Sequence, residues 1–280
     1  MYYSKFHSIF HEHTRIHKAA ANYMNSQQTD YSRYFAIRQK ATLINMSEDR
    51  EREHFESLSG YVVARHGDMI ELHIPYPVDH DPLGSAEKTS YKLTSESLGN
   101  GIQVIGDLIR VIAGNIFQLQ LRGNLELFQR RRAPRIDTTV KLFNLRRDVS
   151  LTLLRKEWKR IVEYMKSKGL PPAVVLRDTP VNLSIGGIRL STGTTTLPLP
   201  LSLFFFDFDD GLPPICTLAE TVWHKLENDE LICGHRFIQI QKSDQERIGR
   251  YVQSIQKQLG IATTTAAKTN WELLDRMTSV

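Results

Sequence analysis

The sequence contains little cysteine and no long apolar run. Its two cysteines, Cys216 and Cys233, form no C-x-x-C pair, so we expect buried thiols in a reducing compartment. The most apolar stretch, Leu197 to Phe208, contains two prolines and falls short of the roughly 20 residues that span a bilayer. The first residues also lack the apolar run of a signal peptide. We therefore predict a cytoplasmic protein with no membrane span.

Catalytic patterns are also missing. A hydrolase nucleophile elbow needs G-x-S-x-G, but Asn182 stands before Ser184 where the first glycine belongs. Several histidines lie near the start of the chain, yet the zinc-protease pattern H-E-x-x-H fails because Arg15 occupies its second histidine position. Solvated histidines on a helix explain this cluster better than a metal site does. We predict no enzyme activity, no metal and no cofactor.

Length and composition fit a folded chain with two modest domains. The sequence has 280 residues, of which 41% are hydrophobic and 24% charged, as is typical of globular proteins rather than disordered ones. The net charge of +5 is compatible with an anionic ligand or partner. Without a basic groove or a recognition helix, so diffuse a charge does not favour nucleic-acid binding.

An arginine cluster, residues 129–135, is the most distinctive stretch. It reads Q-R-R-R-A-P-R, so four of its seven residues are arginine. Planar guanidinium groups bind phosphate through paired hydrogen bonds and stack on flat rings. A charged linker is the alternative explanation for the cluster on its own.

A second stretch, residues 182–187, reads N-L-S-I-G-G. It offers an amide, a hydroxyl and two glycines, so a flat ligand could approach backbone N–H groups closely. A plain β-turn would use the same residue types. Together, the two stretches indicate a ligand with phosphates and a polar ring, which means a nucleotide.

The two motifs also carry a family resemblance. Arg131 and Arg135 fit R-x-x-x-R with Arg130 just before, and residues 182–187 fit [D/N]-x-S-x-x-G. Trp223, Gly234 and Phe237 follow in strand-like runs, before a closing helix. In this order, residues 129 to about 259 resemble the PilZ domain, the bacterial receptor for cyclic di-GMP. The preceding segment resembles, more weakly, the N-terminal barrel of flagellar-brake-type PilZ proteins.

The resemblance implies a cyclic di-GMP site and a role for each residue in it. The implied binding residues are Arg130, Arg131, Arg135, Asn182, Ser184 and Gly187. The arginines at 131 and 135 would grip phosphates and contact guanine, with Arg130 assisting. Asn182 and Ser184 would read a guanine edge, and Gly187 would leave space for the ring. The family's common residue at position 182 is aspartate, with two acceptor oxygens, whereas asparagine has one.

The chain before the arginine cluster divides into a helical and a β part. We predict an N-terminal helical segment over 1–40, because apolar residues recur every three or four positions in 1–25. Residues 26–59 are polar and charged and favour a loop or a solvated helix. From residue 60, short strands over 61–65, 69–74, 102–112 and 116–121 with regular turns predict a small β-barrel, so we assign 41–128 to an N-terminal, flagellar-brake-like barrel domain. After the arginine cluster, further strands are predicted over 136–143, 188–191, 197–207, 215–224 and 231–241.

The rest of the chain is predicted as a PilZ domain, 129–259, with a helical insertion near 151–168, and a C-terminal tail, 260–280. Apolar residues step by three and four through the insertion: Leu151, Leu154, Trp158, Ile161 and Met165. Ser243 and Glu246 predict a capping box opening a final helix, whose inward residues are expected at Ile248, Tyr251, Val252, Ile255 and Leu259. The fold class is therefore mainly β with added helices, as two small β-barrels in tandem, the second a PilZ-type six-stranded barrel with a C-terminal helix.

The leading functional hypothesis is a bacterial second messenger receptor for signal transduction. It would bind cyclic di-GMP between the interdomain arginine motif and the N-x-S-x-x-G turn. Ligand binding would change the domain arrangement and so regulate a protein partner in flagellar motility or other surface behaviour. The alternative is a PilZ-fold protein–protein adaptor that binds no nucleotide. A third hypothesis, nucleic-acid binding on the basic face of 155–168, predicts steep salt dependence. A homo-oligomer also stays open, since the N-terminal stripe must pack on something.

Overall fold

The computed structural model describes residues 31–46, 54–78, 89–97, 100–112, 115–128, 134–192 and 198–260. Several predictions fall elsewhere in the chain: the helix over 1–25 with its histidines, the tail 260–280 beyond Gly260, and two of the site residues, Arg130 and Arg131. They lie outside the described residues.

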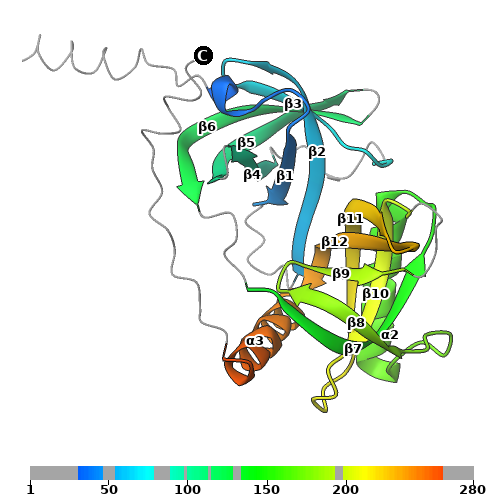
Figure 1. Cartoon of the computed structure of the whole chain (residues 1–280). Helices are drawn as coiled ribbons and strands as arrows, with labels where there is room; N and C mark the ends of the chain where they lie inside the picture. The colour runs from blue at the N-terminus through cyan, green and yellow to red at the C-terminus, as the bar shows by residue number, and fades with distance from the viewer. Residues whose placement is uncertain are drawn as a thin grey trace, which may run out of the picture.

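The N-terminal half forms a closed antiparallel barrel of six strands (Figure 1). A single 3-10 turn, Tyr31–Tyr34, precedes it. The strands are β1 Lys40–Asn45, β2 His54–His66, β3 Met69–His73, β4 Ser90–Ser97, β5 Asn100–Ile112 and β6 Ile116–Phe128. They follow the order β1-β4-β5-β6-β3-β2, and pairing of β1 with β2 closes the ring. Alternating buried residues along β1 and β3 line its interior.

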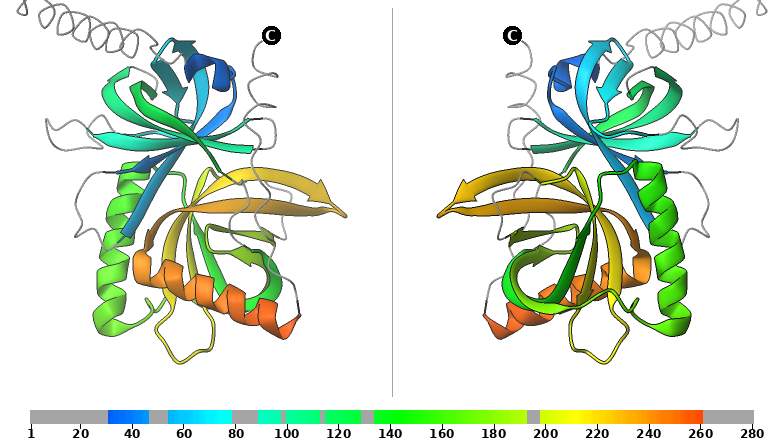
Figure 2. Two further views of the ribbon diagram at one scale, coloured as in Figure 1. Left: turned by 90° about the vertical axis from the view of Figure 1, so that its left-hand side faces the viewer. Right: turned by 90° about the vertical axis from the view of Figure 1, so that its right-hand side faces the viewer.

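The C-terminal half forms a second closed barrel of six antiparallel strands. The strands are β7 Ile136–Arg146, β8 Arg177–Ser184, β9 Gly187–Ser191, β10 Leu201–Asp207, β11 Ile215–Glu227 and β12 Glu230–Gln241. The order is β12-β11-β10-β7-β8-β9, and β12 pairs with β9 to close it. Helix α3, Lys242–Gln258, lies across the bottom of this barrel in both side views and buries Ile248 and Val252 against its core (Figure 2). The predicted fold class, two small barrels in tandem with a helix closing the second, is confirmed.

One long strand joins the two barrels into a single sheet. The first residues of β2 extend beyond its own barrel and pair with the end of β12, matching Glu56 with Gln239. The remainder of β2 pairs with β1 and β3. The twelve strands thus share one continuous hydrogen-bonded network across the boundary between the barrels.

Helix α2, Leu151–Lys168, lies along one side of the second barrel, and its first turn reaches the boundary with the first barrel (Figure 2). All five residues of the predicted apolar stripe are buried. The indole nitrogen of Trp158 donates to the backbone oxygen of Cys216 at 2.9 Å, and the backbone N–H of Leu151 donates to Pro77 of the N-terminal half at 3.1 Å. The side chain of Ser150 caps the first turn by accepting from Leu153. The insertion therefore packs against the protein itself.

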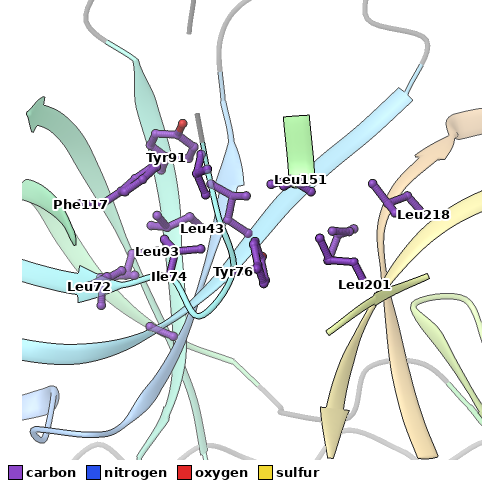
Figure 3. Packing of buried hydrophobic residues seen from close by; sticks show 14 of the residues in the cluster. Leu43, Leu72, Ile74, Tyr76, Tyr91, Leu93, Phe117, Leu151, Leu201 and Leu218 are labelled. Atoms are coloured by element: carbon purple, nitrogen blue, oxygen red, sulfur yellow. The ribbon is translucent and has the colours of Figure 1, made fainter. Parts of the chain in front are cut away.

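A hydrophobic core runs without interruption from one barrel to the other. In Figure 3, Tyr76 and Leu151 lie between the interior of the N-terminal barrel and the side chains of Leu201 and Leu218 on the second barrel. All four side chains are buried. The interior of the second barrel, together with the inner face of α3, forms a separate cluster. Packing as well as strand pairing thus holds the two halves together.

Several local predictions were wrong. The polar segment 26–59 contains β1 and the start of β2 rather than only a loop or helix, because half-buried barrel strands tolerate polar residues on their outer face. The strands β4 and β8 were not predicted. Helix α3 begins at Lys242 with Gln241 as an N-cap that makes no side-chain bond, so the capping box fails. Leu259, expected to point inward, is 59% exposed.

Candidate functional site

The second motif lies where β8 turns into β9 on the second barrel. Val181 and Leu183 are buried in the barrel, so their neighbours Asn182 and Ser184 point outward, since successive side chains of a strand alternate between faces. Ser184 pairs directly with Gly187 across the turn, and its hydroxyl donates to the Gly187 carbonyl at 3.3 Å. The three predicted residues of the N-x-S-x-x-G motif therefore come together on one outer surface.

Gly187 is required because β12 approaches it closely. A β-carbon at this position would lie 2.3 Å from the backbone oxygen of His235 and 3.3 Å from the α-carbon of Arg236, so any larger residue would push the two strands apart. The backbone N–H of Phe237 also donates to the Gly186 carbonyl at 3.0 Å. The turn is therefore held against β12 by the close approach at Gly187 and the hydrogen bond at Gly186.

A row of outward residues crosses the barrel beside the turn. Each member is the direct cross-strand partner of the next. In order, the row runs through Asp137 on β7, Asn182 on β8, Arg189 on β9, Gly234 on β12 and Trp223 on β11. The Trp223 indole lies over Gly234, where a β-carbon would come within 2.3 Å of the indole nitrogen. The row offers a carboxylate, an amide, a guanidinium and an aromatic ring to a ligand.

Polar contacts order the Asn182 end of this row. The amide nitrogen of Asn182 donates to Asp137 Oδ1 at 2.9 Å, and Arg189 Nη2 donates to the same oxygen at 3.1 Å. Sequence reasoning did not propose Asp137 or Arg189 for the site. Strand alternation could have found Arg189, which is two residues after Gly187, but only the barrel brings β7 alongside Asn182.

Arg135 is the one predicted site arginine that the described residues include. It is exposed and immediately precedes Ile136, which pairs with Leu183 in the first register position of β7 and β8. Continuing this antiparallel register by one residue places Arg135 opposite Ser184. The first motif thus ends beside the second, as a shared site requires.

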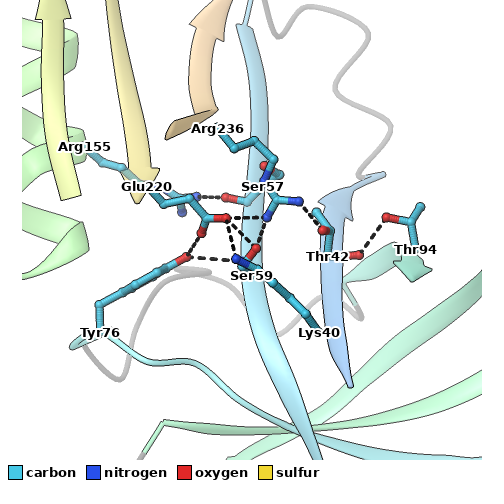
Figure 4. A network of polar contacts seen from close by, with 9 residues as sticks. All are labelled: Lys40, Thr42, Ser57, Ser59, Tyr76, Thr94, Arg155, Glu220 and Arg236. Carbon is cyan, nitrogen blue, oxygen red and sulfur yellow. Dashed lines mark hydrogen bonds and ion pairs between the residues drawn. The ribbon is translucent and has the colours of Figure 1, made fainter. Parts of the chain in front are cut away.

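A polar network at the boundary between the barrels lies next to the site (Figure 4). Arg236 on β12 is the cross-strand partner of Gly187, and its guanidinium binds Glu220 Oε1 on β11 at 2.6 Å. The same guanidinium also donates to Thr42 and Ser59 of the N-terminal barrel. One side chain therefore links the strand that holds the motif turn to the other barrel.

Glu220 is buried, with 2% of its side chain exposed, and donors from the N-terminal barrel satisfy it. The Ser59 hydroxyl donates to one carboxylate oxygen, the Tyr76 hydroxyl donates to the other at 3.2 Å, and Lys40 Nζ lies 3.8 Å away. Burial lowers the pKa of Lys40, while Glu220 acts in the opposite direction. Burial, followed by the Glu220 charge, raises the pKa of Tyr76. Without the N-terminal barrel, this carboxylate would lose most of its partners.

A separate cavity of about 270 Å³ lies between α2, the connection from β10 to β11, and the start of α3. Its lining includes Val162, Leu212 and Asp244. Arg247 beside it is held by Asp210, with a 2.7 Å bond from its Nε, and by the Pro213 carbonyl. Burial raises the pKa of Asp244 to about 6, and the charge of Arg247 opposes part of that rise. Of the predicted motif residues that the structure describes, none lines this cavity.

Replacing Asp244 with asparagine is expected to stabilise the protein above pH 6. A carboxyl whose pKa is higher in the folded state than its ordinary value of 3.8 binds more protons when folded, so its contribution to stability falls as pH rises from about 4 to 6. The variant should gain on the order of 1–2 kcal/mol at pH 8, and this gain should shrink towards pH 4. Urea unfolding of both proteins at pH 4, 6 and 8 measures the difference. A constant difference across the three pH values would contradict the prediction.

The described residues contain neither a cluster of potential metal ligands nor a helix that could cross a membrane. In that part of the chain, no group of three or more histidine, cysteine, aspartate or glutamate side chains could hold a metal ion. Among the helices formed by the same residues, none has the length and apolar character needed to cross a membrane.

Comparisons with solved structures return remote similarities. The chain is similar to the inhibitor of motility MotI/DgrA of Bacillus subtilis, at 14% identity and a TM-score of 0.33, over 82% of this chain and 100% of that one. It is similar to YcgR from Escherichia coli, solved in complex with c-di-GMP, at 12% identity and a TM-score of 0.31, over 80% and 86% of the two chains. It is also similar to MrkH of K. pneumonia in a complex with c-di-GMP, at 14% identity and a TM-score of 0.29, over 83% and 96%. No curated protein matches the chain.

The comparison with protein families gives a direct assignment for the second barrel. The PilZ domain model matches residues 129–254. This range begins at the arginine cluster, includes the β8–β9 turn with its N-x-S-x-x-G motif, and ends within α3. Residues 129–254 of this chain are a PilZ domain.

Proposed function

We propose that the protein is a receptor for cyclic di-GMP, and that the ligand binds on the outer surface where β8 turns into β9. The observation that carries the proposal is that Asn182, Ser184 and Gly187 share this surface, with Arg135 at its edge, inside a PilZ domain. Arg130 and Arg131 complete the proposed binding set. The functional units are the N-terminal barrel domain, 41–128, and the PilZ domain, 129–259.

In this proposal, arginines neutralise the ligand phosphates and polar groups read its bases. Arg131 and Arg135 grip phosphate and contact guanine, because a guanidinium matches both the phosphate oxygens and the N7 and O6 acceptors of guanine. Arg130 assists. Asn182 and Ser184 contact the opposite guanine edge. Trp223 and Arg189 add a flat ring and a further cation along the same outer row.

We further propose that ligand binding alters the arrangement of the two barrels through Arg236. This residue is backbone-paired with Gly187, while its guanidinium binds Glu220 and two hydroxyls of the N-terminal barrel. Ligand phosphates near Gly187 compete with Glu220 for this cation, so an occupied site weakens the contact between the barrels. The output passes to a protein partner in motility or surface behaviour, in keeping with the PilZ resemblance.

Calorimetric titration with cyclic di-GMP, beside GTP and cyclic AMP, tests the receptor proposal. We expect selective binding by the whole chain, with micromolar or lower Kd. Arg135→Ala should raise the Kd by about tenfold to a hundredfold, since a charge-assisted contact is lost. Arg177→Ala, an exposed arginine at the far end of β8, is the matched control and should bind normally. A titration without heat would favour the adaptor function instead.

The proposed change in barrel arrangement has its own measurement. Spin labels placed at two exposed positions, Val63 on β2 and Leu226 on β11, report the distance between the barrels. Saturating cyclic di-GMP should shift or broaden this distance distribution. An unchanged distribution in a protein that binds the ligand would contradict the rearrangement while leaving the receptor function standing.

A further inference from the structure

Asn182 gives the motif one hydrogen-bond acceptor fewer than an aspartate at the same position would. Guanine presents two adjacent donors on one edge, the N1–H and the 2-amino group. An aspartate could accept from both with its two oxygens, whereas asparagine has one acceptor oxygen and an amide nitrogen that only donates. If the Asn182 nitrogen faced the ligand, its donors would oppose the guanine donors.

The neighbouring Asp137 determines which way the Asn182 amide points. A carboxylate can only accept hydrogen bonds, so the 2.9 Å contact with Asp137 Oδ1 must come from the amide nitrogen. The single acceptor of Asn182, its Oδ1, then faces away from that contact. The wrong orientation of the amide, with its nitrogen towards the ligand, is disfavoured because it would place two acceptors against each other.

Only one of the two carboxylate oxygens of Asp137 accepts hydrogen bonds from described residues. Both of its contacts, from Asn182 and from Arg189, end on Oδ1. Its Oδ2 accepts no hydrogen bond from any described residue, and 79% of the side chain is exposed. The second carboxylate oxygen is therefore open on the same outer surface as Asn182.

We propose that Asp137 and Asn182 together form the guanine-reading acceptor pair of this site. Asp137 Oδ2 and Asn182 Oδ1 stand in for the two oxygens of one aspartate, supplied by neighbouring strands. Arg189 holds the carboxylate in place through Oδ1, although an exposed ion pair of this kind contributes little stability by itself. This inference rests on the proposed cyclic di-GMP site, and it makes Asp137 a residue that determines base specificity.

The test compares two ligands that differ by one donor. Cyclic di-IMP carries hypoxanthine, which lacks the 2-amino group of guanine but keeps N1–H. The whole chain is titrated with both ligands as the wild type, Asp137→Ala, and Asp137→Ala combined with Asn182→Asp. Asp178→Ala is the matched control, since Asp178 is also exposed, lies near the start of β8, and pairs with Lys141 in the middle of β7, away from the motif turn.

The wild type should bind cyclic di-GMP more tightly than cyclic di-IMP by about tenfold. In Asp137→Ala only one acceptor is left, so the 2-amino group adds no affinity and the ratio of the two Kd values should fall towards one. Adding Asn182→Asp restores two acceptors on one side chain and should bring the ratio back. Asp178→Ala should behave as the wild type.

The possible failures are distinguishable. If Asp137→Ala weakens both ligands by the same factor, Asp137 only orders its neighbours and the inference is wrong. It is also wrong if the Kd ratio of this variant equals that of the wild type. A wild type that binds neither ligand overturns the receptor function, and with it this inference.

Discussion

Trp158→Ala is expected to lower the free energy of unfolding by about 3–5 kcal/mol, the range for truncating a buried tryptophan. The side chain is 2% exposed and lies within the core that joins the two barrels. Truncation removes this packing and also leaves the Cys216 carbonyl without the 2.9 Å hydrogen bond from the indole. Urea unfolding followed by circular dichroism gives the difference between variant and wild type.

Trp223 provides the matched control, because it is 38% exposed and rests on Gly234 at the surface. Trp223→Ala should change the free energy of unfolding by less than about 1 kcal/mol, while weakening the binding of cyclic di-GMP. Trp158→Ala should instead lower the free energy of unfolding strongly and leave the affinity for cyclic di-GMP unchanged in the fraction of protein that stays folded. Equal loss of stability in the two variants would show that α2 is not an integral part of the core.

Glu220→Ala should destabilise the protein by about 3 kcal/mol, the lower end of the range for breaking a buried ion pair. The variant leaves the Arg236 guanidinium without its 2.6 Å carboxylate partner, and the buried hydroxyl of Tyr76 without an acceptor. Because 27% of the Arg236 side chain is exposed, water offsets part of the loss. Thermal and urea unfolding of the whole chain measure this effect.

A double variant distinguishes the two contributions to this loss of stability, the unpaired charge and the lost packing. Replacing Glu220 and Arg236 with leucine removes both charges, and buried ion pairs exchanged for apolar residues are often neutral in stability. The double variant should therefore be more stable than Glu220→Ala. Arg236→Leu alone, which leaves Glu220 without its nearest cation, should be less stable than the double variant. With Glu220→Leu as the matching single variant, two single losses of stability that simply add up to the loss in the double variant would contradict a coupled pair.

The spacing of apolar residues was sufficient to predict elements that pack through one apolar face. Helix α2 was predicted residue by residue because its stripe follows the helical repeat and Gly169 ends it, with φ 75°. Strands β4 and β8 were missed because polar residues dominate their outer faces, as in the S-Y-K-L-T-S-E-S run of β4. The start of α3 was misplaced because tertiary contacts, rather than a side-chain cap, fix where β12 ends.

The site was predicted from its motif residues, and the structure supplies their neighbours. The spacing within N-x-S-x-x-G is local, so sequence alone could propose Asn182, Ser184 and Gly187. Asp137 comes 45 residues before Asn182, with the α2 insertion between them, so no spacing rule connects the two. The link between Gly187 and the N-terminal barrel is equally invisible in sequence, because it depends on the cross-strand register of Arg236.

Because β2 runs from one barrel to the other, the second barrel cannot be separated from the first without losing a strand partner. A fragment that starts at the arginine cluster would lose the β2 partner of β12, the donors around Glu220, and the apolar cover over Leu201 and Leu218. Such a fragment would expose an unpaired stretch of strand beside an apolar patch, a combination that promotes self-association. Proteolysis between the halves should therefore yield pieces that stay attached to each other, and ligand affinities measured on an isolated PilZ fragment would describe a different molecule from the intact chain.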